Sequence, residues 1–283
     1  MIETVQVRLC ALDGYAHGAR FYSAPTSEAP VQVAVVHCGA AIPAGRYRRF
    51  ADFLAASGIP TLVYDFRGIG VSRPHALRGF RASAEDWAEY DCGGAIAWMR
   101  GRFPHAKIIG IAHSISALLV GGAPNCAEHD RLVFVGGHTG YYGDYRWRYR
   151  VPMAALWHVF MPAITRIVGY FPARRLGLGE DIPAMIALQW AARRSPDLRP
   201  CDMGPGHARV QTLLDRCEAL QRPALLVSVS DDAFATRQGV KRLLSYYPRL
   251  SPLEHIAYTP LEAGRRSLGH FGLFGRRAGA VLW

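Results

Sequence analysis

Disulfide and metal-binding patterns are missing from this 283-residue sequence. The chain has six cysteines: Cys10, Cys38, Cys92, Cys126, Cys201 and Cys217. None of them forms a Cys-x-x-Cys pair, and none has histidine partners at zinc-finger intervals. We therefore expect free thiols in a reducing compartment, no metal and no organic cofactor. The N-terminal residues lack the basic segment and long apolar core of a signal peptide, which predicts a cytoplasmic protein.

Acidic residues and uninterrupted apolar runs are also scarce. The chain has 22 acidic residues against 33 Lys and Arg, which gives a net charge of +11. No nucleic-acid-binding motif accompanies the arginines, so we expect no nucleic-acid partner. The arginines either form a solvated surface or recognise an anionic substrate handle, such as the phosphates of coenzyme A or of an acyl carrier protein.

The longest apolar stretch, 151–170, is broken by two prolines, His158 and Arg166. It does not predict a membrane span, and we expect no membrane contact. A role at a membrane surface through this arginine-bearing segment is nevertheless compatible with the sequence.

Apolar strands alternate with helices along most of the chain. We predict strands at 4–9, 17–22, 31–36, 61–64, 107–112, 131–135, 224–229 and 253–258, and helices near 47–57, 83–102 and 238–247. Continuous apolar runs suit parallel strands that are buried on both faces. The pattern predicts an α/β fold with a mostly parallel central sheet and helices on both faces. The segment 139–222 has helix-like stretches and no clear strand, so we predict a core of 1–138 and 223–283 with an inserted helical cap at 139–222.

The stretch 107–119 combines an apolar strand, Ser114 between small residues, and the start of an apolar helix. This arrangement is typical of a nucleophile elbow, where a tight strand-to-helix turn lifts one hydroxyl above a parallel sheet. Ala112 and Ser116 stand where the Gly-x-Ser-x-Gly pattern has glycines, and both are small enough for strand and helix to approach closely. The alternative is a serine that only caps a buried helix.

Four motifs in this order resemble those of the α/β-hydrolase superfamily. Residues 37–40 (His-Cys-Gly-Ala) follow the third predicted strand, where that family has its His-Gly oxyanion loop. Residues 65–72 (Asp-Phe-Arg-Gly-Ile-Gly-Val-Ser) are similar to the family's Asp-x-Arg-Gly-x-Gly-x-Ser turn. His113-Ser114 lies at the elbow, and Gly269-His270-Phe271 resembles the loop that bears the catalytic histidine. The resemblance covers nearly the whole chain and implies an α/β-hydrolase fold of the serine hydrolase type with a helical cap.

Two stretches, 21–74 and 169–181, are similar to a bacterial group known mainly as predicted α/β hydrolases. That group brings no defined substrate.

The resemblance implies that Ser114 is the nucleophile, Asp232 the acid and His270 the base, in the family's chain order of Ser, acid and His. A serine hydroxyl needs a base, and imidazole, with a pKa of about 6.5, suits the proton transfer. Asp231 is the alternative acid, because both aspartates follow the predicted strand 224–229. The competing histidines are His138 and His207, and neither follows a late strand.

Two backbone N–H groups are expected to form an oxyanion hole. Ile115 supplies the first, and either Gly39 or Ala40 supplies the second; the sequence leaves this choice open. Candidate substrate-binding residues are His113, Trp147, Trp157 and Trp190. The three tryptophans could line an acyl pocket or simply pack the cap onto the core.

We therefore expect a serine hydrolase that cleaves a carboxylic ester or thioester, on a small-molecule or carrier-bound acyl substrate, through an acyl-enzyme. An acyltransferase that uses the same three residues with an alcohol or amine acceptor is one alternative. A non-catalytic binding protein with this fold is another.

Overall fold

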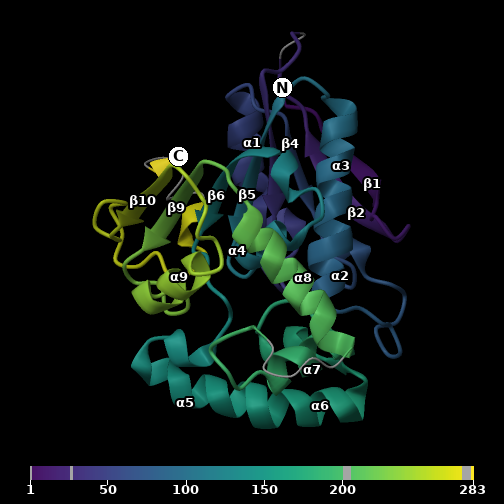
Figure 1. Cartoon of the computed structure of the whole chain (residues 1–283), viewed down its shortest axis with the longest axis vertical. Coiled ribbons are helices and arrows are strands. Elements are labelled where there is room, and N and C mark those ends of the chain that lie inside the picture. Colours follow the sequence, from purple (N-terminus) through teal and green to yellow (C-terminus); the bar gives the residue numbers. More distant parts are fainter. Residues whose placement is uncertain (1, 26–27, 200–204, 276–281) are drawn as a thin grey trace.

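The computed structural model describes residues 2–25, 28–199, 205–275 and 282–283 (Figure 1). Of the residues discussed above, Cys201 and the side chain of His207 lie outside this part. Eight strands form one sheet: β1 (Thr4–Cys10), β2 (Ala16–Tyr22), β3 (Gln32–His37), β4 (Thr61–Tyr64), β5 (Lys107–His113), β6 (His129–Val135), β9 (Ala224–Val229) and β10 (Leu253–Tyr258). Each of them overlaps a strand predicted from the sequence.

The helices include all three that the sequence predicts. The α-helices of the described chain are α1 (Arg48–Ala56), α2 (Ala84–Asp86), α3 (Gly93–Arg102), α4 (Ser116–Leu119), α5 (Trp147–Ala155), α6 (Met161–Val168), α7 (Ala184–Ala192), α8 (Pro205–Ala219) and α9 (Arg237–Leu244). π-Helical turns at Trp87–Cys92 and Leu156–Phe160 join α2 to α3 and α5 to α6. The helix that starts at α2 has a capping box, because Ser83 Oγ accepts from the Asp86 N–H (3.1 Å) and the Asp86 carboxylate accepts from the Ser83 N–H (2.8 Å).

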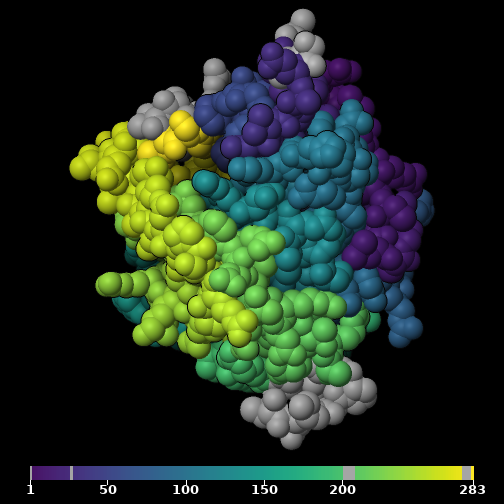
Figure 2. Space-filling model, turned by 45° about the horizontal axis from the view of Figure 1, so that its top comes forward, coloured from purple at the N-terminus to yellow at the C-terminus, as the bar shows by residue number. Residues whose placement is uncertain are grey.

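The strand order is β1-β2-β4-β3-β5-β6-β9-β10. β2 runs antiparallel to both neighbours and all other pairs are parallel, which confirms the predicted mostly parallel sheet. The first strands (purple) and the last (yellow) lie on opposite sides of the molecule (Figures 1 and 2). From β3 the chain moves outward to β4 and then returns to place β5 on the other side of β3. The carboxyl ends of β3 and β5 therefore form a topological switch point, where open α/β sheets bind ligands.

Both faces of the sheet are covered by helices. Val33 and Val35 of β3 belong to the same buried cluster as residues of α3, α8 and α9, whereas Ala34 and Val36 pack in a second cluster with α1. Neither face of β3 therefore meets water, which explains its continuous apolar sequence.

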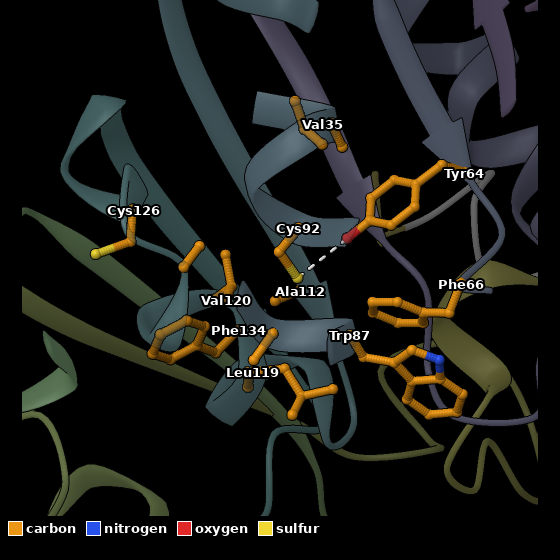
Figure 3. Close-up of a cluster of buried hydrophobic side chains, with 14 of the residues drawn as sticks. Val35, Tyr64, Phe66, Trp87, Cys92, Ala112, Leu119, Val120, Cys126 and Phe134 are labelled. Carbon is orange, nitrogen blue, oxygen red and sulfur yellow. Dashed lines mark hydrogen bonds between the residues drawn. The ribbon is translucent and has the colours of Figure 1, made fainter. Parts of the chain in front are cut away.

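The larger cluster contains polar atoms that are paired internally (Figure 3). The rings of Phe66 and Trp87 stack at a centroid distance of 4.8 Å, and Trp87 Nε1 donates to the Arg67 carbonyl (3.0 Å). Tyr64 Oη lies 3.2 Å from Cys92 Sγ and 2.7 Å from His37 Nδ1. These pairings let polar groups stay buried without an unmet hydrogen bond.

The segment 139–222 differs in part from the prediction. α5, α6 and α7 form a layer at the bottom of Figure 1, but a short hairpin, β7 (Tyr170–Phe171) with β8 (Ile182–Pro183), shows that the expectation of no strand was wrong. α8 contacts the core, since Arg216 Nη1 donates to the Gly122 carbonyl (2.9 Å) and Cys217 Sγ lies 3.6 Å from the Leu118 carbonyl. The division into a core and a cap at 139–222 stays a prediction.

Buried histidines are expected to make the fold sensitive to acid. Burial lowers the pKa of His17 and of His129 to about 4 and that of His138 to about 3, and it holds the pKa of His37 and of His113 well below the usual value. In the unfolded chain these histidines take up a proton near pH 6.5, whereas in the folded chain they stay neutral to a lower pH. Stability therefore falls as the pH drops from about 6.5 to 4. A fall in the pKa of a histidine from its usual 6.5 to about 4 corresponds to a loss of about 3 kcal/mol in the free energy of unfolding over this pH range.

Asp65 and Asp91 act in the opposite direction, because burial raises their pKa values to about 6 and about 7. They are two carboxyl groups against five imidazoles, so the denaturant midpoint should still fall steeply over this pH range. His129→Gln should flatten the profile, and His105→Gln, at an exposed position, should leave it unchanged. A midpoint that is constant from pH 6.5 to 4 would contradict this expectation.

Candidate active site

The candidate site residues follow the carboxyl ends of parallel strands. Ser114 follows β5, Asp232 follows β9 and His270 lies in the segment after β10, while the loop at 38–41 follows β3. Parallel strands place these loops at one edge of the sheet, next to the switch point between β3 and β5.

Ser114 occupies a strained turn between β5 and α4. Its φ is +63°, one of two positive values among non-glycine residues in the described chain. Such a conformation is costly for a residue with a Cβ and is held by its surroundings. The Ser114 N–H donates to the Val135 carbonyl (3.0 Å), and Ser116 Oγ donates to the Cys38 carbonyl. A positive φ at the serine is the geometry of a nucleophile elbow, and it forms here without the flanking glycines.

Ser114, His270 and Asp232 are joined by two hydrogen bonds. Ser114 Oγ lies 2.9 Å from His270 Nε2, and His270 Nδ1 lies 2.7 Å from Asp232 Oδ2. The carboxylate fixes the ring proton on Nδ1, which leaves the Nε2 lone pair directed at the serine hydroxyl. The side chain of Ser114 is nearly covered, with 7% of the residue exposed. The structure therefore brings together the three residues that the sequence singles out.

The two adjacent aspartates have different partners. Burial alone would raise the pKa of Asp232, but hydrogen bonds from His270 and from the N–H groups of Phe234 (2.8 Å) and Ala235 (3.0 Å) hold it below its ordinary value. Asp231 instead accepts from Ser267 Oγ and from the N–H groups of Leu268 and Gly269. Asp232 thus contacts the imidazole, and Asp231 ties down the loop that carries it.

A second histidine contacts the same hydroxyl. His138 Nε2 lies 3.1 Å from Ser114 Oγ, and the Gly140 N–H donates to His138 Nδ1 (2.8 Å). Burial lowers the pKa of His138 to about 3, so the ring is neutral and carries one proton. Because Nδ1 accepts a hydrogen bond, that proton lies on Nε2 and is donated to Ser114 Oγ. His138 therefore has no lone pair facing Ser114, and it cannot take the serine proton.

The predicted oxyanion loop supplies one free amide where the sequence left two candidates. The Gly39 N–H is already donated to Tyr47 Oη (2.8 Å), which disqualifies Gly39 as the donor. Neither Ala40 nor Ile115 donates its N–H to another group in the described part of the chain. Asp65 holds this loop, since its carboxylate accepts from the N–H groups of Ala44 (2.6 Å) and Val71 (3.0 Å).

His113 lies behind the site, contrary to the expectation that it binds substrate. Its ring is fully buried, with Nε2 3.1 Å from the His270 carbonyl and Nδ1 2.7 Å from Tyr47 Oη. Burial holds the pKa of His113 well below its usual value, so the ring is neutral. Nε2 then donates to the His270 backbone and Nδ1 accepts from Tyr47, which fixes the position of the base.

The three candidate tryptophans lie in different places. Trp147 is 81% exposed on the outer surface, so its assignment to the substrate pocket is wrong. Trp190 lies beside the site, because its Nε1 donates to the Gly140 carbonyl (3.3 Å). Trp157 packs behind Trp190 at a ring-centroid distance of 5.4 Å.

Sequence reasoning missed two groups. From the sequence His138 is only a competing base, and no motif points to Phe234, whose ring lies 5.2 Å from that of His270. Gly136 (φ +55°) permits the turn that brings His138 in, and a Cβ there would lie 3.3 Å from Asp232 Oδ2. The Gly136-Gly137 pair after β6 is the sequence signal that could have indicated this turn.

Comparison with known proteins gives one family match and several similar folds. Residues 28–164 match the family described as serine aminopeptidase, S33. The match covers just under half of the chain and includes Ser114, but it ends before Asp232 and His270. No curated protein matches the sequence.

Several solved structures share the fold. They include an esterase of Pyrococcus furiosus (14% identity, 96% of this chain and 85% of that chain, TM-score 0.60) and the α/β hydrolase GrgF of Penicillium sp. sh18 (16%, 98% and 95%, 0.62). A thioesterase domain from the curacin biosynthetic pathway is also similar (13%, 99% and 97%, 0.53). These likenesses confirm the predicted α/β-hydrolase fold.

Proposed function

This chain belongs to the α/β-hydrolase superfamily, and we propose that it is a serine hydrolase that cleaves a carboxylic ester or thioester through an acyl-enzyme. The observation that carries the proposal is the unbroken hydrogen-bond chain from Ser114 through His270 to Asp232. Nucleophile, base and orienting acid are the parts that acyl transfer requires.

In the acylation step, Ser114 Oγ bonds to the substrate carbonyl carbon while His270 Nε2 takes its proton. The N–H groups of Ile115 and Ala40 donate to the oxyanion, and Asp232 stabilises the imidazolium. His270 then gives the proton to the departing alkoxide or thiolate. In deacylation, His270 takes a proton from water, hydroxide adds to the acyl carbon, and Ser114 leaves and recovers its proton.

His138 is assigned a further part in both steps. Negative charge builds on Ser114 Oγ as it attacks and again as it leaves, and the His138 Nε2–H points at this atom. Losing a hydrogen-bond donor to developing charge typically costs about 10²-fold in rate. We expect His138→Leu to lower kcat by about this factor on a p-nitrophenyl ester. His138→Gln, which keeps an N–H donor, should recover much of the loss, and a fully active His138→Leu would contradict the assignment.

The substrate proposal rests on the aromatic groups near Ser114. A Cβ at Gly140 would lie 3.1 Å from Trp190 Nε1 and 3.5 Å from Ile115 Cδ1, so the indole and the side chain of the residue after the nucleophile both lie next to Gly140. These surroundings favour an apolar acyl group.

The proposed function is tested with p-nitrophenyl esters from acetate to decanoate and with the corresponding acyl-coenzyme A thioesters. We expect hydrolysis in at least one series and a shifted chain-length preference in Trp190→Ala. Trp147→Ala, with its ring on the outer surface, is the matched control and should keep the wild-type preference. Free acid as the product with alcohols and amines present supports hydrolysis; an ester or amide product would favour an acyltransferase. No turnover of any substrate would contradict the proposed function.

A further inference from the structure

α5, the π-helical turn Leu156–Phe160 and α6 form one continuous helical segment, Trp147–Val168. Its inner face repeats every four residues through Met153, Trp157, Met161 and Thr165, and the last three of these are buried. A second series with the same spacing is offset by two residues, which places it on the opposite face. That outer series is Trp147, Val151, Ala155, Val159, Ala163 and Ile167.

The outer face is apolar and uncovered. The exposed fractions are 81% for Trp147, 78% for Val151, 60% for Val159, 56% for the adjacent Phe160 and 77% for Ile167. Ala155 is half-buried, so the exposed side chains form two groups, at 147–151 and at 159–167. Exposed apolar side chains that gather on one face mark an interaction surface. The segment has 22 residues, and an 18-residue window within it has a mean hydropathy of 1.4, so it is long and apolar enough to cross a membrane by length and composition. Its inner face, however, is packed against the rest of the protein. A contact that leaves the fold intact must therefore use the outer face alone.

The charges around this face have one sign. Between Asp144 and Glu180 the sequence contains six arginines and no acidic residue. Arg148 and Arg150 neighbour Trp147 and Val151, and Arg166 precedes Ile167. In the described part of the chain, none of these three arginines forms an ion pair with an acidic side chain. Arg150 Nε donates to the Tyr145 carbonyl (2.9 Å), and the Arg148 guanidinium lies over the Tyr149 ring, so their positive charges are not neutralised. An apolar helix face with such cations is complementary to anionic lipid headgroups above acyl chains.

We propose that the outer face of Trp147–Val168 docks on the surface of an anionic phospholipid bilayer, with the helix lying in the plane of the interface. The exposed apolar side chains would enter the acyl boundary while the arginines contact phosphates. Pairing of two copies through this face would bring like charges together, which disfavours self-association. The proposal does not depend on the catalytic assignment, since none of these outer-face residues contacts Ser114, His270 or Asp232.

The test is flotation of the full-length protein with vesicles of phosphatidylcholine alone or mixed with phosphatidylglycerol. We expect binding to the mixed vesicles and little to the neutral ones. The variant Trp147→Ser/Val151→Ser/Ile167→Ser should lose this binding. The matched control is Val31→Ser/Val71→Ser/Leu261→Ser, which removes three exposed apolar residues elsewhere (74%, 58% and 84% exposed) and should float like wild type. Arg148→Gln/Arg150→Gln/Arg166→Gln should weaken partitioning by ~100-fold at low salt.

Three results would overturn the proposal. One is the absence of binding of the wild-type protein to anionic vesicles. Another is an outer-face variant that floats with the vesicles as well as the wild type does. The third is a wild-type dimer, measured by light scattering, that the outer-face variant converts to a monomer, since this would assign the face to a second copy. Circular dichroism and the thermal midpoint establish that each variant is folded.

Discussion

Asp232→Asn is expected to lower kcat/KM for an ester substrate by about 10⁴-fold with little change in fold. An asparagine amide can donate to His270 Nδ1, which would move the ring proton to Nε2 and remove the lone pair that now faces Ser114 Oγ. The rate should be measured at saturating and at low substrate, so that the loss can be assigned to kcat and not to binding.

The neighbouring aspartate provides the matched control. Asp231→Asn keeps a carbonyl oxygen for part of the contacts with Ser267, Leu268 and Gly269 but does not touch the imidazole. We expect a loss of about tenfold or less, because only the support of the loop is weakened. Equal losses in the two variants, or a larger one in Asp231→Asn, would show that the acid has been assigned to the wrong residue.

Ser114→Ala is expected to remove nearly all hydrolysis, a decrease of about 10⁶-fold in kcat, because the atom that bonds to the acyl group is gone. Ser116→Ala is its control. Ser116 Oγ donates to the Cys38 carbonyl and so helps position the loop before Ala40, but it contacts neither His270 nor Asp232. Its loss should be small compared with that of Ser114→Ala. Hydrolysis by purified Ser114→Ala at a rate close to that of the wild type, with no change in the substrate profile, would contradict the nucleophile assignment.

The sequence predicts the sheet well because its strands are buried on both faces. Such strands are continuous apolar runs, as in β3, and the helices between them fix the parallel direction. The triad residues follow from chain order combined with a resemblance to a known family. Chain order alone does not separate Asp231 from Asp232. The side chains of adjacent residues in a turn face different directions, and only the hydrogen bonds of each aspartate show which one contacts His270.

Three features could not be predicted from the sequence, for physical reasons. Trp147 lies on a helix that is apolar on both faces, so periodicity does not distinguish the packed face from the exposed one. The choice between Gly39 and Ala40 depends on Tyr47, whose hydroxyl occupies the Gly39 amide from a different element. The role of His138 depends on which ring nitrogen carries the proton, and this is set by the backbone N–H of Gly140.

The most direct test of the central claim is covalent trapping of the nucleophile. Wild-type protein is treated with a fluorophosphonate, digested, and analysed by mass spectrometry, with Ser114→Ala and Asp232→Asn treated in parallel. We expect a single modified residue, Ser114, no modification in Ser114→Ala, and much slower modification in Asp232→Asn. A folded wild-type protein that stays unmodified, or one that is labelled at a residue other than Ser114, would contradict the account.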